Sequence, residues 1–296
     1  MRVGRRDLVL IVVALSAVST SGPIIASMAV VPAMAIAFWR NAFAGAVLVP
    51  WTLATRRNEL RALEARERRL VLVASVMLAL HFATWIPAVT CTSVASATAL
   101  VATQPIWAAL ISTARGVAIE RRVWLGILVA FGGALLLTGA DLQVSGRALL
   151  GDGLALLGGL FAAGYMTAGS EVRRSVTTTT YTAVCYSLTA LMLLVTCLVG
   201  RQSLAGYDGR DWVKLLALTA GAQLLGHSLF NVVLRTVSPT VVSMALLLEI
   251  PGAALIAAAF VSGQHVPLLA VPAAGLLVAG LAIVISSGER ESAPVE

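Results

Sequence analysis

Apolar residues fill long, nearly continuous runs along this chain, and charged residues collect in the short gaps between the runs. A helix that crosses a bilayer needs about 20 consecutive, mostly apolar residues. Ten runs meet that requirement, so the pattern predicts an all-α membrane protein with ten transmembrane helices. The helices are expected over residues 8–28, 31–53, 70–89, 92–113, 123–140, 149–169, 178–199, 212–234, 239–262 and 266–287.

The composition agrees with a membrane protein. Mean hydropathy is +0.92 and only 12% of residues are charged, whereas a soluble protein has roughly a quarter of its residues charged. The net charge of +7 does not indicate nucleic-acid binding, because no basic face interleaved with aromatic residues is present. The three cysteines, Cys91, Cys185 and Cys197, lack paired spacing, so neither a disulfide framework nor a metal site is expected.

The placement of Arg and Lys predicts the orientation, because cytoplasmic loops carry an excess of both residues. With the N-terminus inside, sixteen basic residues fall in cytoplasmic segments and four in outer segments. We therefore expect a multi-pass protein of the cell (inner or plasma) membrane with both termini in the cytoplasm. The first run could also be read as a signal peptide. We interpret it as an uncleaved helix, since its removal would leave nine spans.

The stretch His81–Pro105 recurs in diverged form 146 positions later, as His227–Pro251. The histidine match carries weight because the chain has only three His. The duplication predicts a first five-helix repeat over 1–145, a second over 146–288 and a cytoplasmic tail over 289–296. The identical pairs are His81 with His227, Thr90 with Thr236, Ala99 with Ala245, Leu100 with Leu246 and Pro105 with Pro251.

Five spans in each half is an odd number, so the second half must lie upside down relative to the first. Transporters built from such inverted repeats bind substrate near the bilayer midplane, at the interface between the repeats. The pattern therefore predicts transport by alternating access.

Four passages resemble the drug/metabolite transporter superfamily, in its EamA-like group: PAMAIAFWRNAFAGAVLVPW, TSVASATALVATQPIWAALIS, LLGDGLALLGGLFAAGYMTAGSEVRR and VSPTVVSMALLLEIPGAALIAA. The resemblance covers residues 8–287. The last passage departs from the family's Leu-Glu-x-Pro-like ending, because an extra Ile250 lies between Glu249 and Pro251. The resemblance implies a small-metabolite carrier of the inner or plasma membrane, often an exporter of amino acids or related compounds, without naming the substrate.

Ionisable groups inside a bilayer cost at least about 2.5–3.5 kcal/mol and so must face protein, water or ligand. The Arg40 guanidinium suits a substrate carboxylate or phosphate. Alternatively it binds helix-end carbonyls or reaches the outer headgroups, a structural role that the family's arginine near this position favours. Glu249 lies beside Pro251, which breaks the helix hydrogen bonding. It is the proton-coupling candidate, and the alternative is a fixed pairing with Arg40 or with a hydroxyl in the other half.

The matched histidines are the best candidates for contact with substrate, although a lone histidine on an apolar face is more often a core residue. Trp85 lies one helical turn beyond His81, and Asn231 one turn beyond His227, so each pair shares a helix face. Further candidates are Ser96 and Gln104, although interhelical hydrogen bonds are the commoner use of such groups, and the aromatic residues Trp39, Tyr165 and Tyr186.

Small residues spaced by four allow helices to pack closely. Such pairs are Ala155 with Gly159, Gly159 with Ala163, and Gly275 with Ala279. Whether they pack within one chain or between two is left open, and so is the choice between monomer and homodimer.

The sequence predicts a secondary transporter of a small metabolite, an amino acid or related compound, with export as the expected direction and import left open. Energy comes from a gradient, most cheaply of protons, or from the substrate's own gradient. Two alternatives stay open: a cationic drug/proton exchanger that relies on Glu249, and a membrane-embedded transferase. The chain lacks HExxH and phosphate-loop motifs, so we expect no enzyme activity, cofactor or metal. The expected partners are a small-molecule substrate and the lipid bilayer.

Overall fold

The structure, a computed structural model, describes residues 4–92, 97, 100–138, 145–260 and 269–287. All regular elements within these ranges are helices. They are α1 (Arg5–Val18), α2 (Ser21–Ala26), α3 (Ala33–Thr55), α4 (Arg57–Arg61), α5 (Ala65–Cys91), α7 (Gln104–Ala114), α8 (Arg121–Thr138), α9 (Gly146–Val172), α10 (Thr178–Val199), α11 (Gly209–Leu218), the π-helix η1 (Thr219–His227), α12 (Ser228–Val233), α13 (Pro239–Leu246), α14 (Glu249–Phe260) and α15 (Ala270–Ser286).

The described residues contain six helical segments that are long and apolar enough to cross a membrane, so the chain is a multi-pass membrane protein. These are Arg5–Ile25, Ala33–Thr55, Ala65–Val89, Gly146–Val172, Thr178–Val199 and Gly209–Val233, joined by shorter apolar helices at Pro239–Gly252 and Val271–Ser286. The predicted count of ten is therefore confirmed only in part. Each of four predicted spans, 92–113, 123–140, 239–262 and 266–287, also includes residues outside the described ranges.

The predicted span over 239–262 is interrupted, because α13 ends at Leu246 and α14 begins at Glu249. Pro251 has no N–H to donate to the carbonyl of Leu247. That carbonyl instead accepts from the backbone N–H of Ile250 at 3.3 Å, in a tighter turn. The proline thus accounts for the break, which leaves Glu249 at the first position of a new helix.

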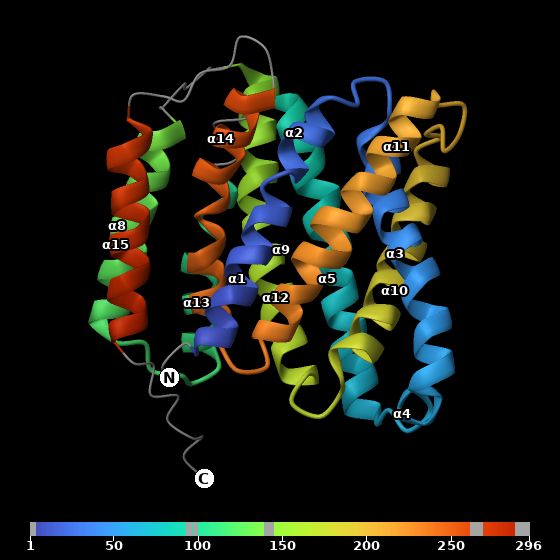
Figure 1. Cartoon of the computed structure of the whole chain (residues 1–296), viewed down its shortest axis with the longest axis horizontal. Coiled ribbons are helices and arrows are strands. Elements are labelled where there is room, and N and C mark those ends of the chain that lie inside the picture. The colour runs from blue at the N-terminus through green and yellow to red at the C-terminus, as the bar shows by residue number, and fades with distance from the viewer. Residues whose placement is uncertain (1–3, 93–96, 98–99, 139–144, 261–268, 288–296) are drawn as a thin grey trace.

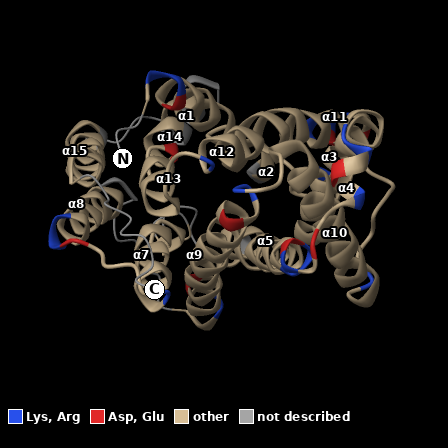
Figure 2. Ribbon diagram, turned by 90° about the horizontal axis from the view of Figure 1, so that it is seen from below, with Lys and Arg blue, Asp and Glu red and all other residues tan. Residues whose placement is uncertain are grey.

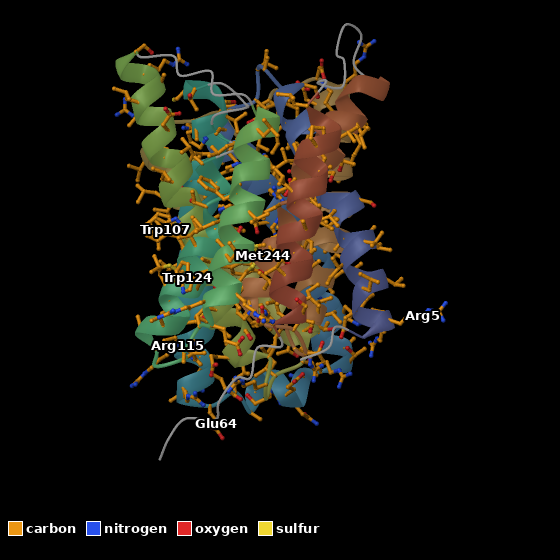
Figure 3. All side chains as sticks on the ribbon, turned by 90° about the vertical axis from the view of Figure 1, so that its left-hand side faces the viewer. Arg5, Glu64, Trp107, Arg115, Trp124 and Met244 are labelled. Carbon is orange, nitrogen blue, oxygen red and sulfur yellow. The ribbon has the colours of Figure 1, made fainter. Side chains whose placement is uncertain are left out.

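Helices of the first half pack mainly against helices of the second half. The main pairs are α5 with α9 and α10, α8 with α15, α3 with α10, α1 with η1 and α12, and α7 with α9 and α13. The pair of α8 and α15 forms one edge of the bundle (Figure 1) and faces the viewer in Figure 3. Each pairing joins segments far apart in the sequence, so the interior is formed by both halves.

The turns predicted to be cytoplasmic all lie at one end of the bundle. This lower end carries the start of α1, all of α4, the α9–α10 turn and the start of α13 (Figure 1). Viewed from below, Lys, Arg, Asp and Glu lie mostly at helix ends and in turns (Figure 2). The charged residues therefore mark the ends of an apolar bundle.

Three carboxylates at the lower end join the first half to the α9–α10 turn. The Glu59 carboxylate accepts from the backbone N–H of Thr177 at 2.7 Å and from the hydroxyl of Thr180 at 2.5 Å. Glu67 accepts from the Ser175 hydroxyl at 2.5 Å. Glu171 lies 3.0 Å from the Arg115 guanidinium and 3.6 Å from those of Arg66 and Arg174. We call Glu59, Glu67 and Glu171 the lower-end carboxylates.

Replacement of Glu59 by glutamine is expected to make the stability of the protein less sensitive to acid. Partial burial raises the pKa of Glu59, but hydrogen bonds from Thr180 and Thr177 outweigh it, so the pKa lies below its ordinary value of 4.5. A carboxyl with a lowered pKa stabilises the folded state above its ordinary pKa, and this stabilisation is lost as the pH falls through the lowered pKa. Thermal unfolding in detergent between pH 7 and pH 3 measures the effect.

The matched control is Glu120→Gln, which changes an exposed carboxylate at the start of α8, also at the lower end. We expect the difference in unfolding temperature between the wild type and Glu59→Gln to be constant near neutral pH and to shrink below pH 4.5. A difference that does not change with pH would contradict this account of Glu59.

Candidate functional site

The Arg40 side chain is buried where both halves meet, with 1% of its surface exposed. Its Nε donates to the Gln223 side-chain oxygen at 2.9 Å, and the guanidinium lies 4.5 Å from the centre of the Phe82 ring. The Nη2 atom has no hydrogen-bond partner. Within the described residues Arg40 forms no ion pair, so its charge is held by a neutral amide and an aromatic face.

Gln223 was not among the residues predicted from sequence. It lies in the π-helix η1 and donates to the Asn41 side-chain oxygen at 3.1 Å, while Asn41 donates to the carbonyl of Ala37 at 2.8 Å. The widened turn of η1 leaves the Gln223 carbonyl to accept from the Ser228 hydroxyl at 3.3 Å. The one available signal was an amide inside an apolar run.

The two matched histidines lie on either side of Phe82. The His81 ring lies nearly parallel to that of Trp85, at 9° with centroids 6.1 Å apart, and its Nδ1 lies 2.9 Å from the carbonyl of Gly158. The His227 ring contacts Phe82 edge-on at 6.0 Å. The Arg40 guanidinium lies over the same Phe82 ring. The structure thus brings His81 and His227 to the ring that Arg40 contacts, with Trp85 stacked on His81.

The Glu249 side chain is partly exposed at the first turn of α14. It interacts electrostatically with Arg40, but the described residues include no ion pair between the two. Its backbone carbonyl, not its carboxylate, accepts from the Ser19 hydroxyl at 3.4 Å. The alternative role predicted from the sequence was a fixed pairing of this carboxylate with Arg40 or with a hydroxyl in the other half. Neither pairing is found within the described residues. The first turn of a helix favours a negative charge there.

Two of the other predicted residues lie apart from this cluster. Gln104 donates to the Ser243 hydroxyl and to the Met166 sulfur, both at 3.1 Å, and so joins α7, α9 and α13. Asn231 is 1% exposed and is bonded to Arg173, Tyr165 and Tyr186. Ser96 lies outside the described residues.

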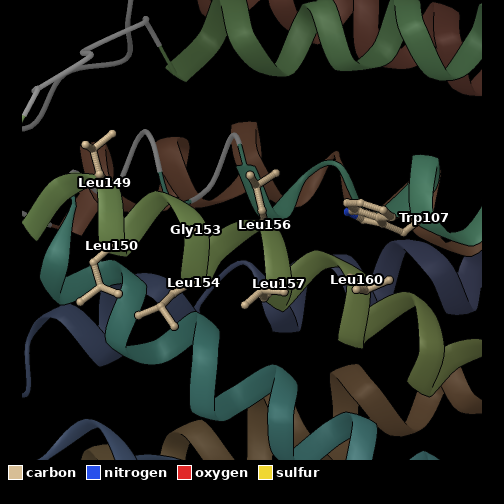
Figure 4. Close-up of a pocket in the computed structure, with 8 residues that line it drawn as sticks. All are labelled: Trp107, Leu149, Leu150, Gly153, Leu154, Leu156, Leu157 and Leu160. Atoms are coloured by element: carbon tan, nitrogen blue, oxygen red, sulfur yellow. The ribbon is translucent and has the colours of Figure 1, made fainter. Parts of the chain in front are cut away.

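An apolar cleft of about 520 Å³ lies along α9 and is lined by Trp107, Gly153 and six leucines (Figure 4). Two of these leucines, Leu149 and Leu150, are about 60% exposed. The Trp107 N–H is bonded to the Thr103 hydroxyl at 3.1 Å. Because the lining is leucine, this cleft suits hydrocarbon and offers no recognition of a polar solute. The polar cluster around Arg40 is the candidate site.

We call Arg40, His81, Phe82, Trp85, His227 and Glu249 the central cluster. The Nη2 of Arg40 and the indole N–H of Trp85 have no hydrogen-bond partner. Within the part of the chain that the structure describes, no hydrogen bond or ion pair of the Glu249 carboxylate is found. Both charge signs are therefore present beside aromatic surface. A polar cluster inside a two-repeat helical bundle is the arrangement of a membrane transporter.

Comparisons with known proteins agree that this is a membrane transporter. Residues 6–139 and again residues 149–286 match the model of the EamA-like transporter family. The chain therefore belongs to the EamA-like transporter family, whose members are membrane transporters of small molecules. One solved crystal structure, described only as that of a protein, has a TM-score of 0.79 over 97% of this chain and 99% of its own. It is 17% identical, so it supports the fold alone. No curated protein matches significantly.

Proposed function

We propose that this protein exports a small carboxylate-bearing metabolite, an amino acid or a related compound, across the cytoplasmic membrane by alternating access. The observation that carries the proposal is Arg40, a fully buried guanidinium that has no ion-pair partner among the described residues and one nitrogen without any partner. An unsatisfied buried donor costs about 1–3 kcal/mol, and more when it is charged. A substrate carboxylate removes that cost.

The central cluster also suits the other end of an amino acid. Glu249 supplies a carboxylate for an ammonium group, and Arg40 supplies a guanidinium for the carboxylate. The ring of Phe82, which the Arg40 guanidinium contacts, and the stacked pair of His81 and Trp85 offer aromatic surface in the same cluster. A zwitterion therefore matches the two charges of the cluster better than an anion alone.

Two features support alternating access between inverted halves. The first helix of the first half, α1, begins at the lower end of the bundle, and α9 begins at the upper end (Figure 1). Numbering the predicted spans from one to ten, the packed pairs include 1–8, 2–7, 3–6, 4–9 and 5–10. Exchanging the halves, which adds five to each number, turns 1–8 into 6–3 and 3–6 into 8–1, and it leaves 2–7, 4–9 and 5–10 unchanged. Two halves related by a two-fold axis have this property.

The orientation follows from the same arrangement. The Arg-rich turns share the lower end, and cytoplasmic segments carry the excess of Arg and Lys. In this orientation both termini are cytoplasmic. The two-repeat architecture has its substrate site where the repeats meet, which is where Arg40 lies.

A second candidate function is exchange of a cationic drug for protons. It is favoured by one observation: Glu249, a partly exposed residue, forms no ion pair within the described residues. In that function Glu249 alternately holds a proton and a cation, while Arg40 only stabilises the structure. The two functions therefore differ in whether transport requires Arg40.

The test is uptake and counterflow in proteoliposomes with an imposed pH gradient, for a panel of labelled amino acids and a panel of cationic dyes. We expect flux of an amino acid that Arg40→Ala abolishes. Dye flux that survives Arg40→Ala but requires Glu249 would replace the proposal with cation–proton exchange. Arg174→Ala, which changes an exposed arginine (59% of its side chain) at the lower end, is the matched control. Absence of both fluxes from folded protein would overturn both functions.

A further inference from the structure

A second arginine, Arg173, is buried in the interior next to the lower end. It caps the C-terminus of α9 and is 1% exposed. Its Nη1 donates to the Asn231 side-chain oxygen at 2.7 Å, and the guanidinium lies 4.7 Å from the centre of the Tyr181 ring. Its Nε and Nη2 atoms have no partner. Arg173 therefore repeats the arrangement at Arg40: one amide partner, one aromatic face and free guanidinium donors.

The charge of Arg173 is not balanced by a carboxylate within the described residues. Glu171 is close in sequence, but its ion pairs are with Arg66, Arg115 and Arg174. The ionisable groups beside Arg173 are Tyr165, Tyr181 and Cys185. Phenols and thiols are uncharged near neutral pH. A buried charge without a counter-charge is costly, so this site lacks an anion.

Hydrogen bonds connect the two buried arginines. Asn231 accepts from Arg173 and donates to the Tyr186 hydroxyl at 3.2 Å. The Tyr186 and Ser228 hydroxyls lie 3.4 Å apart, and Ser228 donates to the carbonyl of Gln223 at 3.3 Å. The side chain of Gln223 accepts from Arg40. A continuous polar path thus runs from the central cluster towards the lower end.

The Arg173 site is occluded in this conformation. Gly169, one turn before Arg173, has no side chain, and a Cβ there would contact Tyr181 Oη and lie 2.6 Å from Arg173 Nη1. The unpartnered nitrogens have no exposed surface. Asn231 is on α12, whereas Arg173 is on α9, so the site opens when α12 moves away from α9. Opening of the lower end during alternating access has that effect.

We propose that Arg173, with Asn231 and Tyr181, is a second binding station for the carboxylate of the substrate, between Arg40 and the cytoplasm. This inference rests on the proposed function, because it takes the anion to be the group that Arg40 binds. Two stations of the same chemistry let a carboxylate leave one guanidinium for another instead of crossing an apolar stretch alone. Arg173 binds the anion when the lower end opens, and Asn231 closes over it afterwards.

The experiment measures the reaction of individual arginines with phenylglyoxal, in the full-length protein in detergent, by peptide mass spectrometry. Sodium acetate is the carboxylate probe, and sodium chloride at the same ionic strength is the reference. A bidentate, charge-assisted pair with the carboxylate should slow the modification of Arg173 about tenfold. Arg174, the exposed neighbour, serves as the internal control and should show no protection.

The same measurement is made on the Asn231→Asp variant, because aspartate has nearly the shape of asparagine and places a fixed carboxylate beside Arg173. In this variant we expect acetate to have no further effect on Arg173 while it still protects Arg40. Three results would overturn the station: equal reaction rates in acetate and chloride, no reaction of Arg173 in folded protein, and acetate protection that persists unchanged in Asn231→Asp. The second result counts because a site that never opens cannot receive substrate.

The same experiment separates this inference from the proposed function. Acetate protection of Arg173 without amino-acid flux in proteoliposomes would keep the anion station and reject amino-acid transport. Amino-acid flux that requires Arg40, without protection of Arg173, would keep the proposed function and reject the station.

Discussion

Gly280→Leu is expected to destabilise the protein by about 3 kcal/mol, the upper range for adding a side chain to a packed interface. A Cβ on Gly280 would lie 2.5 Å from the carbonyl oxygen of Gly126 and 2.7 Å from the backbone nitrogen of Ala130. These are main-chain atoms of α8, so rotation of a side chain cannot relieve the contact. Helix α15 must therefore separate from α8. Thermal unfolding in detergent measures the loss.

The interface is reciprocal, which makes the effect large. A Cβ on Gly126 would lie 2.7 Å from the carbonyl oxygen of Gly280, and one on Gly133 would lie 2.8 Å from that of Ala273. Small residues on both helices thus let the two backbones touch, as is common where van der Waals packing joins helices in a bilayer. We expect Gly126→Leu to resemble Gly280→Leu.

The matched controls come from the same two helices. A Cβ on Gly275 of α15, or on Gly132 of α8, would meet nothing within 4 Å. Gly275→Leu and Gly132→Leu add the same side chain to the same helices without a clash, so we expect the unfolding temperature to stay near that of the wild type. Equal losses in Gly275→Leu and Gly280→Leu would contradict the role of backbone contact.

These glycines also show what the sequence could and could not predict. Spacing by four selected Gly159, and a Cβ there would indeed lie 3.0 Å from the carbonyl oxygen of Val101. The same rule selected Gly275, which faces open space, and omitted Gly280. Periodicity identifies a stripe of small residues, but the partner helix decides which stripe is covered. In a bilayer the helix face that packs against another helix and the face that contacts lipid are both apolar, so composition does not distinguish the two faces.

The helical class and the basic lower end were predictable because each depends on local composition. Because Pro251 has no backbone N–H, a break in the helix before it was implied. The hydropathy pattern nevertheless predicted 239–262 as one span. Hydropathy therefore predicts where an apolar run lies, but it does not predict where the helix within that run breaks. Boundaries move where a proline or a π-turn changes the hydrogen bonding.

Within the site, the sequence identified charged and imidazole groups and missed their partners. Arg40, His81, Trp85 and His227 were predicted and lie together. Gln223 was missed, because an amide becomes a partner for a guanidinium only through packing between helices 183 residues apart.

The roles assigned to Asn231 and Arg173 show the same limit. Spacing by four placed Asn231 on the face of His227, but the π-helix η1 ends at His227. The regular helix α12 begins at Ser228, so the turn between the two residues is helical. Asn231 is nonetheless bonded to Arg173, Tyr165 and Tyr186 of α9 and α10, and this pairing depends on packing between helices. Arg173 was counted among the cytoplasmic charges, since its position at a helix end gives no indication that the side chain turns inward.

Glu249→Gln is expected to remove the response of transport to a pH gradient while the protein stays folded. Glutamine has nearly the same shape, and the carboxylate has no ion pair to lose within the described residues, so the unfolding temperature should change little. If Glu249 carries a proton during the cycle, as we propose, that proton couples flux to the gradient. In Glu249→Gln, substrate should equilibrate across the membrane without accumulating. Glu120→Gln, at an exposed carboxylate, is the matched control.

Two roles of Glu249 are separated by comparing an amino acid with its des-amino analogue in the same proteoliposomes. If the carboxylate binds the ammonium group, Glu249→Gln raises the half-saturating concentration of the amino acid and leaves that of the analogue unchanged. If it carries the coupling proton, gradient-driven accumulation of both compounds is lost. For the amino acid we expect both a raised half-saturating concentration and lost accumulation, because a carboxylate that exchanges a proton for an ammonium group links the two. Unchanged transport at every pH would exclude Glu249 from the cycle and leave Arg40 as the one charged residue of the central cluster that acts on substrate.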